Sequence, residues 1–232
     1  MRQPLVKRVV AEAIGTSFLL AAVVGSGIMA ERLAGGNLAL ALLANTAATG
    51  AALVALIISF VPVSGAHFNP VVTLSFALRR DLVWRDVPFY LLAQMLGGIG
   101  GVITANVMFD LPAVFVSQHT RTGMAQVFSE FVATLGLVTV ILASSRSTIA
   151  VVAVAVGAYI SAAYWFTAST SFANPAVTVA RSLSDTFAGI RPFDTPGFVL
   201  AQLAGGIVAT ALFGWLMPTE NDERNEQIPQ AS

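Results

Sequence analysis

Two asparagines, each followed directly by proline, are the side chains of this sequence best suited to meet a solute. They stand in the triplets Asn69-Pro70-Val71 and Asn174-Pro175-Ala176. Asparagine is a favoured helix N-cap, and proline suits the first helical turn because its missing N–H would be unpaired there. Each triplet therefore predicts the start of a helix. A helix start presents free N–H groups and the positive end of the helix dipole, so the two starts can donate hydrogen bonds to a passing oxygen and disfavour cations.

The helices that these triplets begin are too short to cross a membrane. The apolar segments 69–78 (NPVVTLSFAL) and 174–183 (NPAVTVARSL) would each extend roughly 15 Å, about half of a hydrocarbon core. One Asn-Pro pair alone usually marks a turn, but two pairs that each precede a half-length apolar helix indicate a functional feature. We expect the two half-helices to enter from opposite faces and to meet near the midplane.

The composition is typical of a polytopic membrane protein. Of the 232 residues, 56% are hydrophobic and 10% are charged, against about a quarter charged in soluble domains. The formal net charge is zero, which leaves a nucleic-acid partner unsupported. The chain contains no cysteine, and this excludes disulfides, thiolate nucleophiles and thiolate metal sites.

Six apolar runs have about the 20 residues that a helix needs to span the hydrocarbon core. They are 8–30, 38–61, 87–109, 125–144, 149–168 and 195–217. Cytoplasmic termini would place eight of the 12 Lys and Arg residues in the cytoplasm, in agreement with the positive-inside bias: Arg2, Lys7, Arg8, Arg79, Arg80, Arg85, Arg146 and Arg224. We expect a multi-pass protein of the cell membrane with a retained first span and a polar tail over 218–232.

The two halves form an internal repeat within one domain, 1–217. Each half has a glutamate in its first span, an Asn-Pro pair, and a glutamine followed by glycines: Glu12, Asn69 and Gln94 in about 8–110, and Glu130, Asn174 and Gln202 in about 125–217. Each repeat carries three spans, an odd number, so the second copy must have the opposite orientation. Short proline-interrupted segments at matched positions of an inverted repeat point to a permeation or binding site.

These features together resemble the aquaporin (major intrinsic protein) family. The similarity rests on SGAHFNPVVT, on NPAVT, on the two glutamates and on six spans with two half-helices, and it covers roughly 8–217. It implies an all-α membrane protein with the aquaporin fold, in which six transmembrane helices and two re-entrant half-helices form an inverted repeat, assembled in lipid as a homotetramer. It also implies roles without any cofactor or metal: Glu12 and Glu130 brace the pore loops, and carbonyls line the pore at Gly65, Ala66 and His67.

At one position the sequence departs from the family pattern. Most members have arginine after the second Asn-Pro-Ala, and here the residue is Val177. Offsets from the two asparagines place the other positions of the selectivity filter at Thr49, Ala162 and Ser171. All four side chains are small and uncharged, so we expect a wide filter that passes solutes larger than water.

These expectations favour a passive channel for small neutral solutes: water, glycerol-like polyols, and arsenite or antimonite as neutral hydroxides. Such open filters resemble those of aquaglyceroporin-like channels in bacterial arsenic-resistance systems. Thr178 stands where glycerol facilitators typically have aspartate, which weakens a dedicated glycerol role. The alternatives are a coupled secondary transporter, with Glu12 and Glu130 as its titratable groups, and a structural membrane protein with a closed pore. An enzyme is not expected, because no nucleophile and base or metal cluster appears within the spans.

Arg181 leaves two interpretations open. It lies one helical turn beyond Val177 on the same face, so its charge could enter the outer vestibule and partly replace the missing arginine. Alternatively, it extends to the membrane interface or pairs with Asp185, four residues further on.

Overall fold

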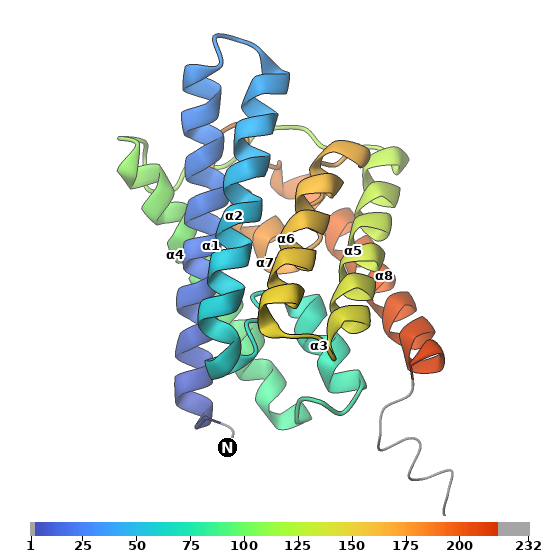
Figure 1. Ribbon diagram of the computed structural model, residues 1–232. Coiled ribbons are helices and arrows are strands. Elements are labelled where there is room, and N and C mark those ends of the chain that lie inside the picture. The colour runs from blue at the N-terminus through green and yellow to red at the C-terminus, as the bar shows by residue number, and fades with distance from the viewer. Residues whose placement is uncertain (1–2, 218–232) are drawn as a thin grey trace, which may run out of the picture.

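The computed structural model describes residues 3–217, and the predicted tail over 218–232 lies outside the described residues, as do Arg2 and Arg224. Within residues 3–217, six helices are long and apolar enough to cross a membrane, which confirms the predicted spans (Figure 1). The α-helices are α1 (Leu5–Leu33), α2 (Leu38–Ser64), α3 (Pro70–Leu78), α4 (Val87–Met108), α5 (Met124–Ser144), α6 (Ile149–Phe166), α7 (Pro175–Arg181) and α8 (Thr195–Leu216). Two 3-10 turns, η1 (Trp84–Asp86) and η2 (Pro192–Asp194), precede α4 and α8.

The long helices form two matched groups of three. In the first half α1 packs against α2 and α4, and in the second half α5 packs against α6 and α8. The contact between α2 and α6 joins the two groups. The half-helices α3 and α7 fill the space between the groups, α3 toward the N-terminal end of α1 and α7 above it in the view of Figure 1. The all-helical architecture with two half-helices is therefore confirmed.

Glycines allow the closest helix contacts, and they do so at matching places in the two halves. A Cβ on Gly97 of α4 would lie 2.3 Å from the backbone oxygen of Ala13 in α1. A Cβ on Gly205 of α8 would lie 2.4 Å from the backbone oxygen of Phe131 in α5. Small residues let membrane helices approach backbone to backbone, so these glycines draw each half together around its half-helix.

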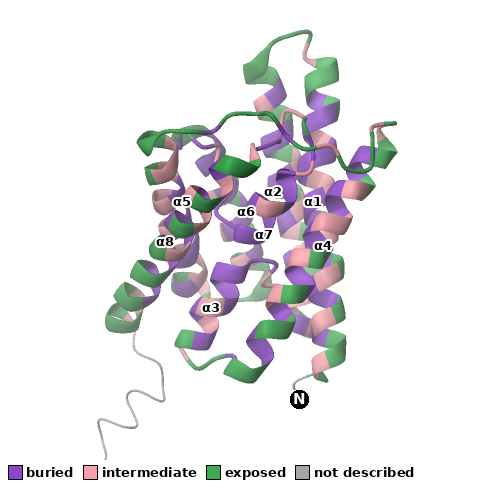
Figure 2. Ribbon diagram, turned by 180° about the vertical axis from the view of Figure 1, so that it is seen from behind, coloured by how far each residue is buried: buried purple, intermediate pink, exposed green. Residues whose placement is uncertain are grey.

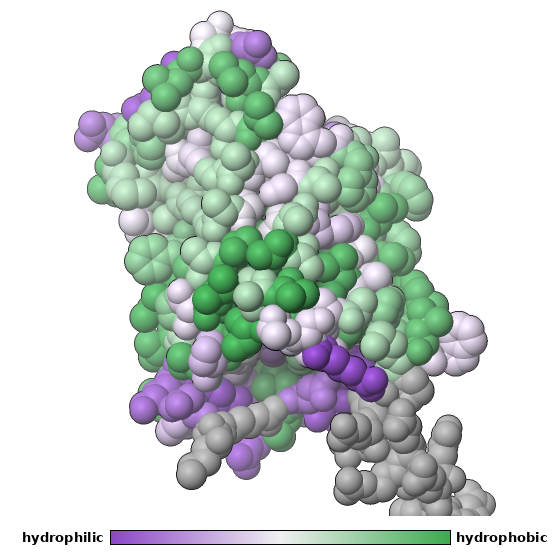
Figure 3. All heavy atoms as spheres, in the orientation of Figure 1, coloured by the Kyte–Doolittle hydropathy of each residue, from purple (hydrophilic) through white to green (hydrophobic). Residues whose placement is uncertain are grey.

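The outer surface is apolar along most of its height. Figure 3 shows hydrophobic residues over the body of the molecule, and hydrophilic ones at its two ends, most of them at the end near the N-terminus. Large exposed apolar side chains lie on several helices, among them Phe18, Leu96, Phe128 and Ile207. Figure 2 shows the complementary pattern, with buried residues concentrated on α3, α7 and the inner faces of the long helices. The core therefore surrounds the half-helices, and the outer face suits lipid.

Candidate functional site

The two asparagines hold the half-helices together by a reciprocal pair of hydrogen bonds. Asn69 Nδ2 donates to the backbone oxygen of Ala173 at 2.8 Å, and Asn174 Nδ2 donates to that of Phe68 at 2.8 Å. Each Oδ1 caps its own helix, accepting from the Val71 amide at 2.9 Å in one case and from the Ala176 amide at 2.9 Å in the other. The predicted helix starts are thus confirmed. One N–H of each side-chain amide is used in this latch, which leaves the other for a solute.

Glu12 and Glu130 brace the two loops that lead into the half-helices. Glu12 accepts hydrogen bonds from the His67 amide at 3.0 Å and from the Phe68 amide at 2.7 Å. Glu130 accepts from the amides of the equivalent loop, Phe172 at 2.9 Å and Ala173 at 2.8 Å. Both carboxylates are completely buried. The arrangement supports the bracing role expected from the resemblance.

A second layer of hydrogen bonds fixes these carboxylates. Gln94 Nε2 donates to Glu12 at 2.8 Å and to the Thr73 hydroxyl at 2.9 Å. In the second half, Gln202 Nε2 donates to Glu130 at 2.6 Å and to the Thr178 hydroxyl at 2.8 Å. Thr178, which occupies the position of the aspartate typical of glycerol facilitators, therefore helps to hold Gln202 in place. The two halves therefore repeat not only the sequence motifs but also these hydrogen bonds.

Both loops contain residues in the left-handed backbone region. Ala66 and Phe68 have φ of 51° and 49°, and their counterparts Ser171 and Ala173 have φ of 51° and 49°. Such conformations are unfavourable for residues with a Cβ and persist where the surroundings enforce them. Here the glutamates and the asparagine latch supply that constraint, and the result is an irregular backbone that leads into each half-helix.

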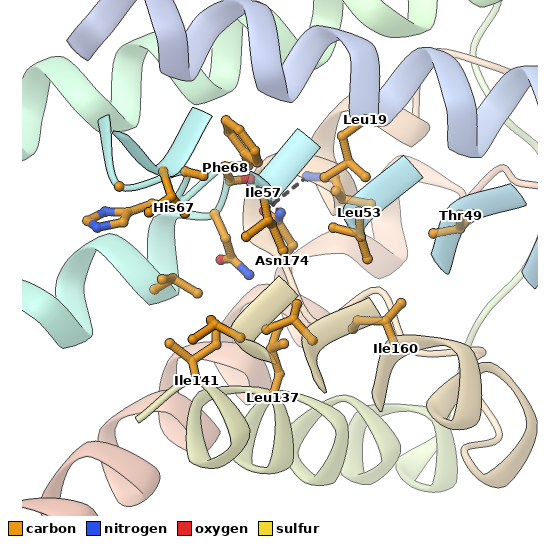
Figure 4. A pocket seen from close by; sticks show the side chains of 18 of the residues that line it. Leu19, Thr49, Leu53, Ile57, His67, Phe68, Leu137, Ile141, Ile160 and Asn174 are labelled. Atoms are coloured by element: carbon orange, nitrogen blue, oxygen red, sulfur yellow. Dashed lines mark hydrogen bonds between the residues drawn. The ribbon is translucent and has the colours of Figure 1, made fainter. Parts of the chain in front are cut away.

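A cavity of about 290 Å³ runs beside this latch. Figure 4 shows Thr49 at one end, His67 at the other and Asn174 between them. Gly65, Ala66 and His67 line it, as does Asn69. Apolar side chains of α2, α5 and α6 also line it: Leu53, Ile57, Leu137, Ile141, Val156 and Ile160. The lining thus combines polar groups of the two loops with apolar side chains of the long helices.

Three of the four predicted filter residues line the cavity, and the fourth does not. Thr49, Ser171 and Val177 are buried and face it. Ala162 is exposed and is not part of the lining. The α6 residues that do line it, including Ile160 and Tyr164, follow a four-residue spacing from Val152, and Ala162 lies half a turn from that face. The prediction of Ala162 from its offset is therefore wrong, and the four-residue spacing is the signal that would have identified Tyr164.

Arg181 points inward. It is 2% exposed, it lines the cavity, and its Cζ lies 3.5 Å from the ring centroid of Phe172. Its Nε donates to the backbone oxygen of Ala188. Asp185 is engaged elsewhere and accepts from the Gln118 amide at 2.8 Å. Extension to the membrane interface and pairing with Asp185 are both contradicted, and of the two interpretations the structure supports the inward one.

Sequence reasoning missed a second buried arginine, Arg121, in the loop between α4 and α5. Its Nε donates to the backbone oxygen of Gly189 at 2.8 Å and its Nη1 to that of Ser169 at 3.1 Å. Its Cζ lies 4.9 Å from the Phe172 centroid, and burial lowers its pKa to about 10. A lone arginine in a loop gives no local pattern, so only the tertiary fold reveals this position.

The described residues, 3–217, contain no cluster of three or more His, Cys, Asp or Glu side chains that could hold a metal ion. His67 instead packs on Phe76, with ring centroids 4.7 Å apart, and its Nδ1 lies 3.1 Å from the Thr73 hydroxyl. The site is therefore built from amides, hydroxyls, carbonyls and one guanidinium. Such groups bind and orient a solute.

The sequence is similar to a known protein family and to individual relatives. The family model "Major intrinsic protein" matches residues 1–149 and 143–231. "Aquaglyceroporin AqpS" of Rhizobium meliloti (strain 1021) is 57% identical over 213 residues, which cover 92% of this chain and 91% of that relative. "Aquaporin NIP3-1" of Oryza sativa subsp. japonica is 32% identical over 163 residues, covering 68% of this chain and 51% of the relative.

A solved structure shares the fold. The aquaglyceroporin from Plasmodium falciparum matches with a TM-score of 0.73 at 20% identity, covering 93% of this chain and 98% of the other. The fold, the two half-helices and the family match over nearly the whole sequence agree. The chain belongs to the major intrinsic protein family of membrane channels.

Proposed function

We propose that this protein is a passive channel for small uncharged solutes: water, glycerol-like polyols and metalloid hydroxides such as arsenous and antimonous acid. One observation carries the proposal. The cavity that passes the Asn69 and Asn174 latch is lined both by polar groups of the two loops and by apolar side chains of the long helices. The similarity to a protein named an aquaglyceroporin supports a pore of polyol size.

This lining favours neutral, hydroxylated solutes over ions. Hydroxyl groups can exchange hydrogen bonds with the loop backbone and the free amide N–H groups, while carbon atoms face Leu53, Ile57 and Ile160. An ion would have to shed its hydration shell without full replacement on the apolar side. The positive ends of α3 and α7 meet at the latch and add a barrier to cations.

We further propose that the Thr49 end is wide because Val177 replaces the arginine usual at that position. Val177 lines the cavity and its side chain carries no charge. A larger opening admits polyols and trigonal metalloid hydroxides, which a water-selective filter excludes by size. The proposal extends to a homotetramer in the cell membrane with cytoplasmic termini and the Thr49 end facing outward.

A coupled transporter is less well supported. Its mechanism would need Glu12 or Glu130 to bind and release a coupling ion. Both carboxylates are buried and accept hydrogen bonds from loop amides and from a glutamine. Protonating either one would break the bonds that hold a pore loop.

Stopped-flow light scattering on proteoliposomes tests the proposal, with water, glycerol, urea and arsenous acid as solutes. Wild type should conduct glycerol and arsenous acid at rates well above empty vesicles. Val177→Arg should lower the permeability to these larger solutes by about tenfold or more and lower that to water much less, because a long side chain narrows the opening. Unchanged permeability to every larger solute in Val177→Arg would show that the open-filter account is wrong.

A further inference from the structure

The Arg181 guanidinium has hydrogen-bonding capacity that the described protein does not use. It is 2% exposed, yet among residues 3–217 its one hydrogen-bond acceptor is the backbone oxygen of Ala188, which takes the Nε proton. Guanidinium carries five N–H donors, so the four on its terminal nitrogens have no protein acceptor in this part of the chain. No acidic side chain of the described residues forms an ion pair with it.

A second unused polar group lines the same cavity. The Ser171 hydroxyl is buried and has no hydrogen-bond partner among the described residues. Ser171 and Arg181 both line the cavity, together with Thr49 and Val177. Buried polar groups are normally paired, and an unpaired one costs free energy unless something else satisfies it. Both groups line one cavity, so a molecule that passes through it can supply their partners.

The position of the guanidinium follows from helix geometry and from the small size of Val177. A helical Cβ is tilted toward the N-terminus, so a long side chain reaches back over the preceding turn. Arg181 stacks on Phe172, which precedes α7 in the chain, with Cζ 3.5 Å from the ring centroid. Its charge therefore lies beside the loop that leads into α7. Val177, one turn earlier on the same face, is short enough to leave that path open.

Phe172 holds this cation in a fixed orientation. The ring packs edge to face on Phe198, with centroids 5.3 Å apart, and it also faces the Arg121 guanidinium at 4.9 Å. A guanidinium over an aromatic face is stabilised by the ring quadrupole. Arg181 donates through Nε alone, whereas Arg121 donates through Nε to the Gly189 carbonyl and through Nη1 to the Ser169 carbonyl. Arg121 therefore adds positive potential, and Arg181 adds both charge and free donors.

We infer that Arg181 and Ser171 form a solute-binding subsite at the Thr49 end of the channel, in which Arg181 provides, from one turn further along α7, the cation and donors that residue 177 lacks. The ligand is an oxygen-rich molecule that offers at least two acceptor oxygens, such as a polyol or a neutral metalloid hydroxide. The inference rests on the proposed channel function. On this inference the filter is wide at residue 177, and the Arg181 guanidinium keeps it positively charged.

Cysteine accessibility tests the geometry without relying on solute flux. The natural chain has no cysteine, so Arg181→Cys introduces a single thiol. The matched control is Ala180→Cys on the same helix, because Ala180 is fully buried and packs against Gly98 of α4. In reconstituted vesicles, methyl methanethiosulfonate should modify the Arg181→Cys protein about tenfold faster than the control, since thiol modification follows access, and glycerol should slow only the former. Equal, slow modification of both would overturn the subsite.

Permeability measurements test the chemistry. Arg181→Ala should raise potassium conductance about tenfold and lower the ratio of glycerol to 1,2-propanediol permeability several-fold, because a charged donor to a solute oxygen is lost. Arg181→Lys keeps the charge and should keep potassium out while the permeability ratio falls. Arg32→Ala removes an exposed arginine bonded to the Phe109 carbonyl and should change neither. Identical behaviour of Arg181→Ala and Arg32→Ala would overturn the inference.

The two experiments separate the subsite from the channel function. If wild type passes no glycerol but Arg181→Cys is modified and protected by glycerol, the proposed function fails and the subsite stands. If wild type conducts glycerol but Arg181→Cys reacts no faster than Ala180→Cys, the channel stands and the subsite fails. If Arg181→Ala fails to assemble, the permeability of Arg181→Lys and the comparison of Arg181→Cys with Ala180→Cys still test the subsite.

Discussion

The two pore loops have the same scaffold and different surroundings. Each is braced by a buried glutamate, fixed by a glutamine and latched by an asparagine to the other loop. Around the first loop, His67 packs between Phe76 and Tyr90. Around the second, two buried arginines flank Phe172. The repeat therefore builds the pore symmetrically, and the side chains that differ between its two copies make the two ends electrostatically unequal.

The largest expected effect tests the symmetric part. Glu12→Gln and Glu130→Gln each replace a carboxylate that accepts from two loop amides with a side chain that has one acceptor oxygen. Each should lose about 3 kcal/mol of stability or more, because charge-assisted bonds to buried amides are lost. Thermal melting of the detergent-solubilised protein, followed by fluorescence-detected size exclusion, measures the loss.

The exposed Glu31 provides the control, since Glu31→Gln removes a carboxylate outside the network and should leave the melting temperature unchanged. If one of the two substitutions lowered the melting temperature much less than the other, the two glutamates would not brace their loops equally. The scaffold would then not be symmetric in stability.

The asparagine latch should give a smaller and again symmetric effect. Asn69→Asp and Asn174→Asp keep the cap but replace a donor, 2.8 Å from a backbone oxygen, with a second acceptor. Each should cost about 2 kcal/mol from the unpaired carbonyl and the buried charge. Glycerol flux should fall in both, because the solute also loses an amide donor. Stability and flux are measured on the same preparations, and an unchanged melting temperature in both variants would argue against the latch.

How much of this the sequence predicts depends on how local the signal is. The six spans and both half-helices follow from apolar runs and from Asn-Pro starts, which act within a few residues, and the structure confirms them. The prediction of Ala162 as a filter residue rests on a fixed number of residues before Asn174. It fails because α6 turns a different face to the cavity. Arg121 reaches Phe172 only through the path of a long loop, which no pattern in the sequence specifies.

The smallest expected effect reports directly on the asymmetry between the two ends. His119 lies in the loop between α4 and α5, and its pKa is lowered first by burial and then by the positive charges of Arg121 and Arg181. The chain contains two histidines, so its titration can be followed by NMR of labelled histidine in nanodiscs. Because a neighbouring cation disfavours the imidazolium, Arg181→Ala should raise the pKa of His119 toward its ordinary value of 6.5, and Arg32→Ala should not.

The sign of the linked stability effect follows from the same shift. A histidine whose folded-state pKa is depressed binds fewer protons than it does in the unfolded chain, so its contribution to stability is fully present above pH 6.5 and is lost as the pH falls toward the lowered value. Acidification should therefore lower the melting temperature of wild type slightly more than that of His119→Gln. If instead Arg181→Ala left the His119 pKa unchanged, the charge of Arg181 would not reach this mouth of the pore, and the difference between the two loops would be one of packing and not of potential.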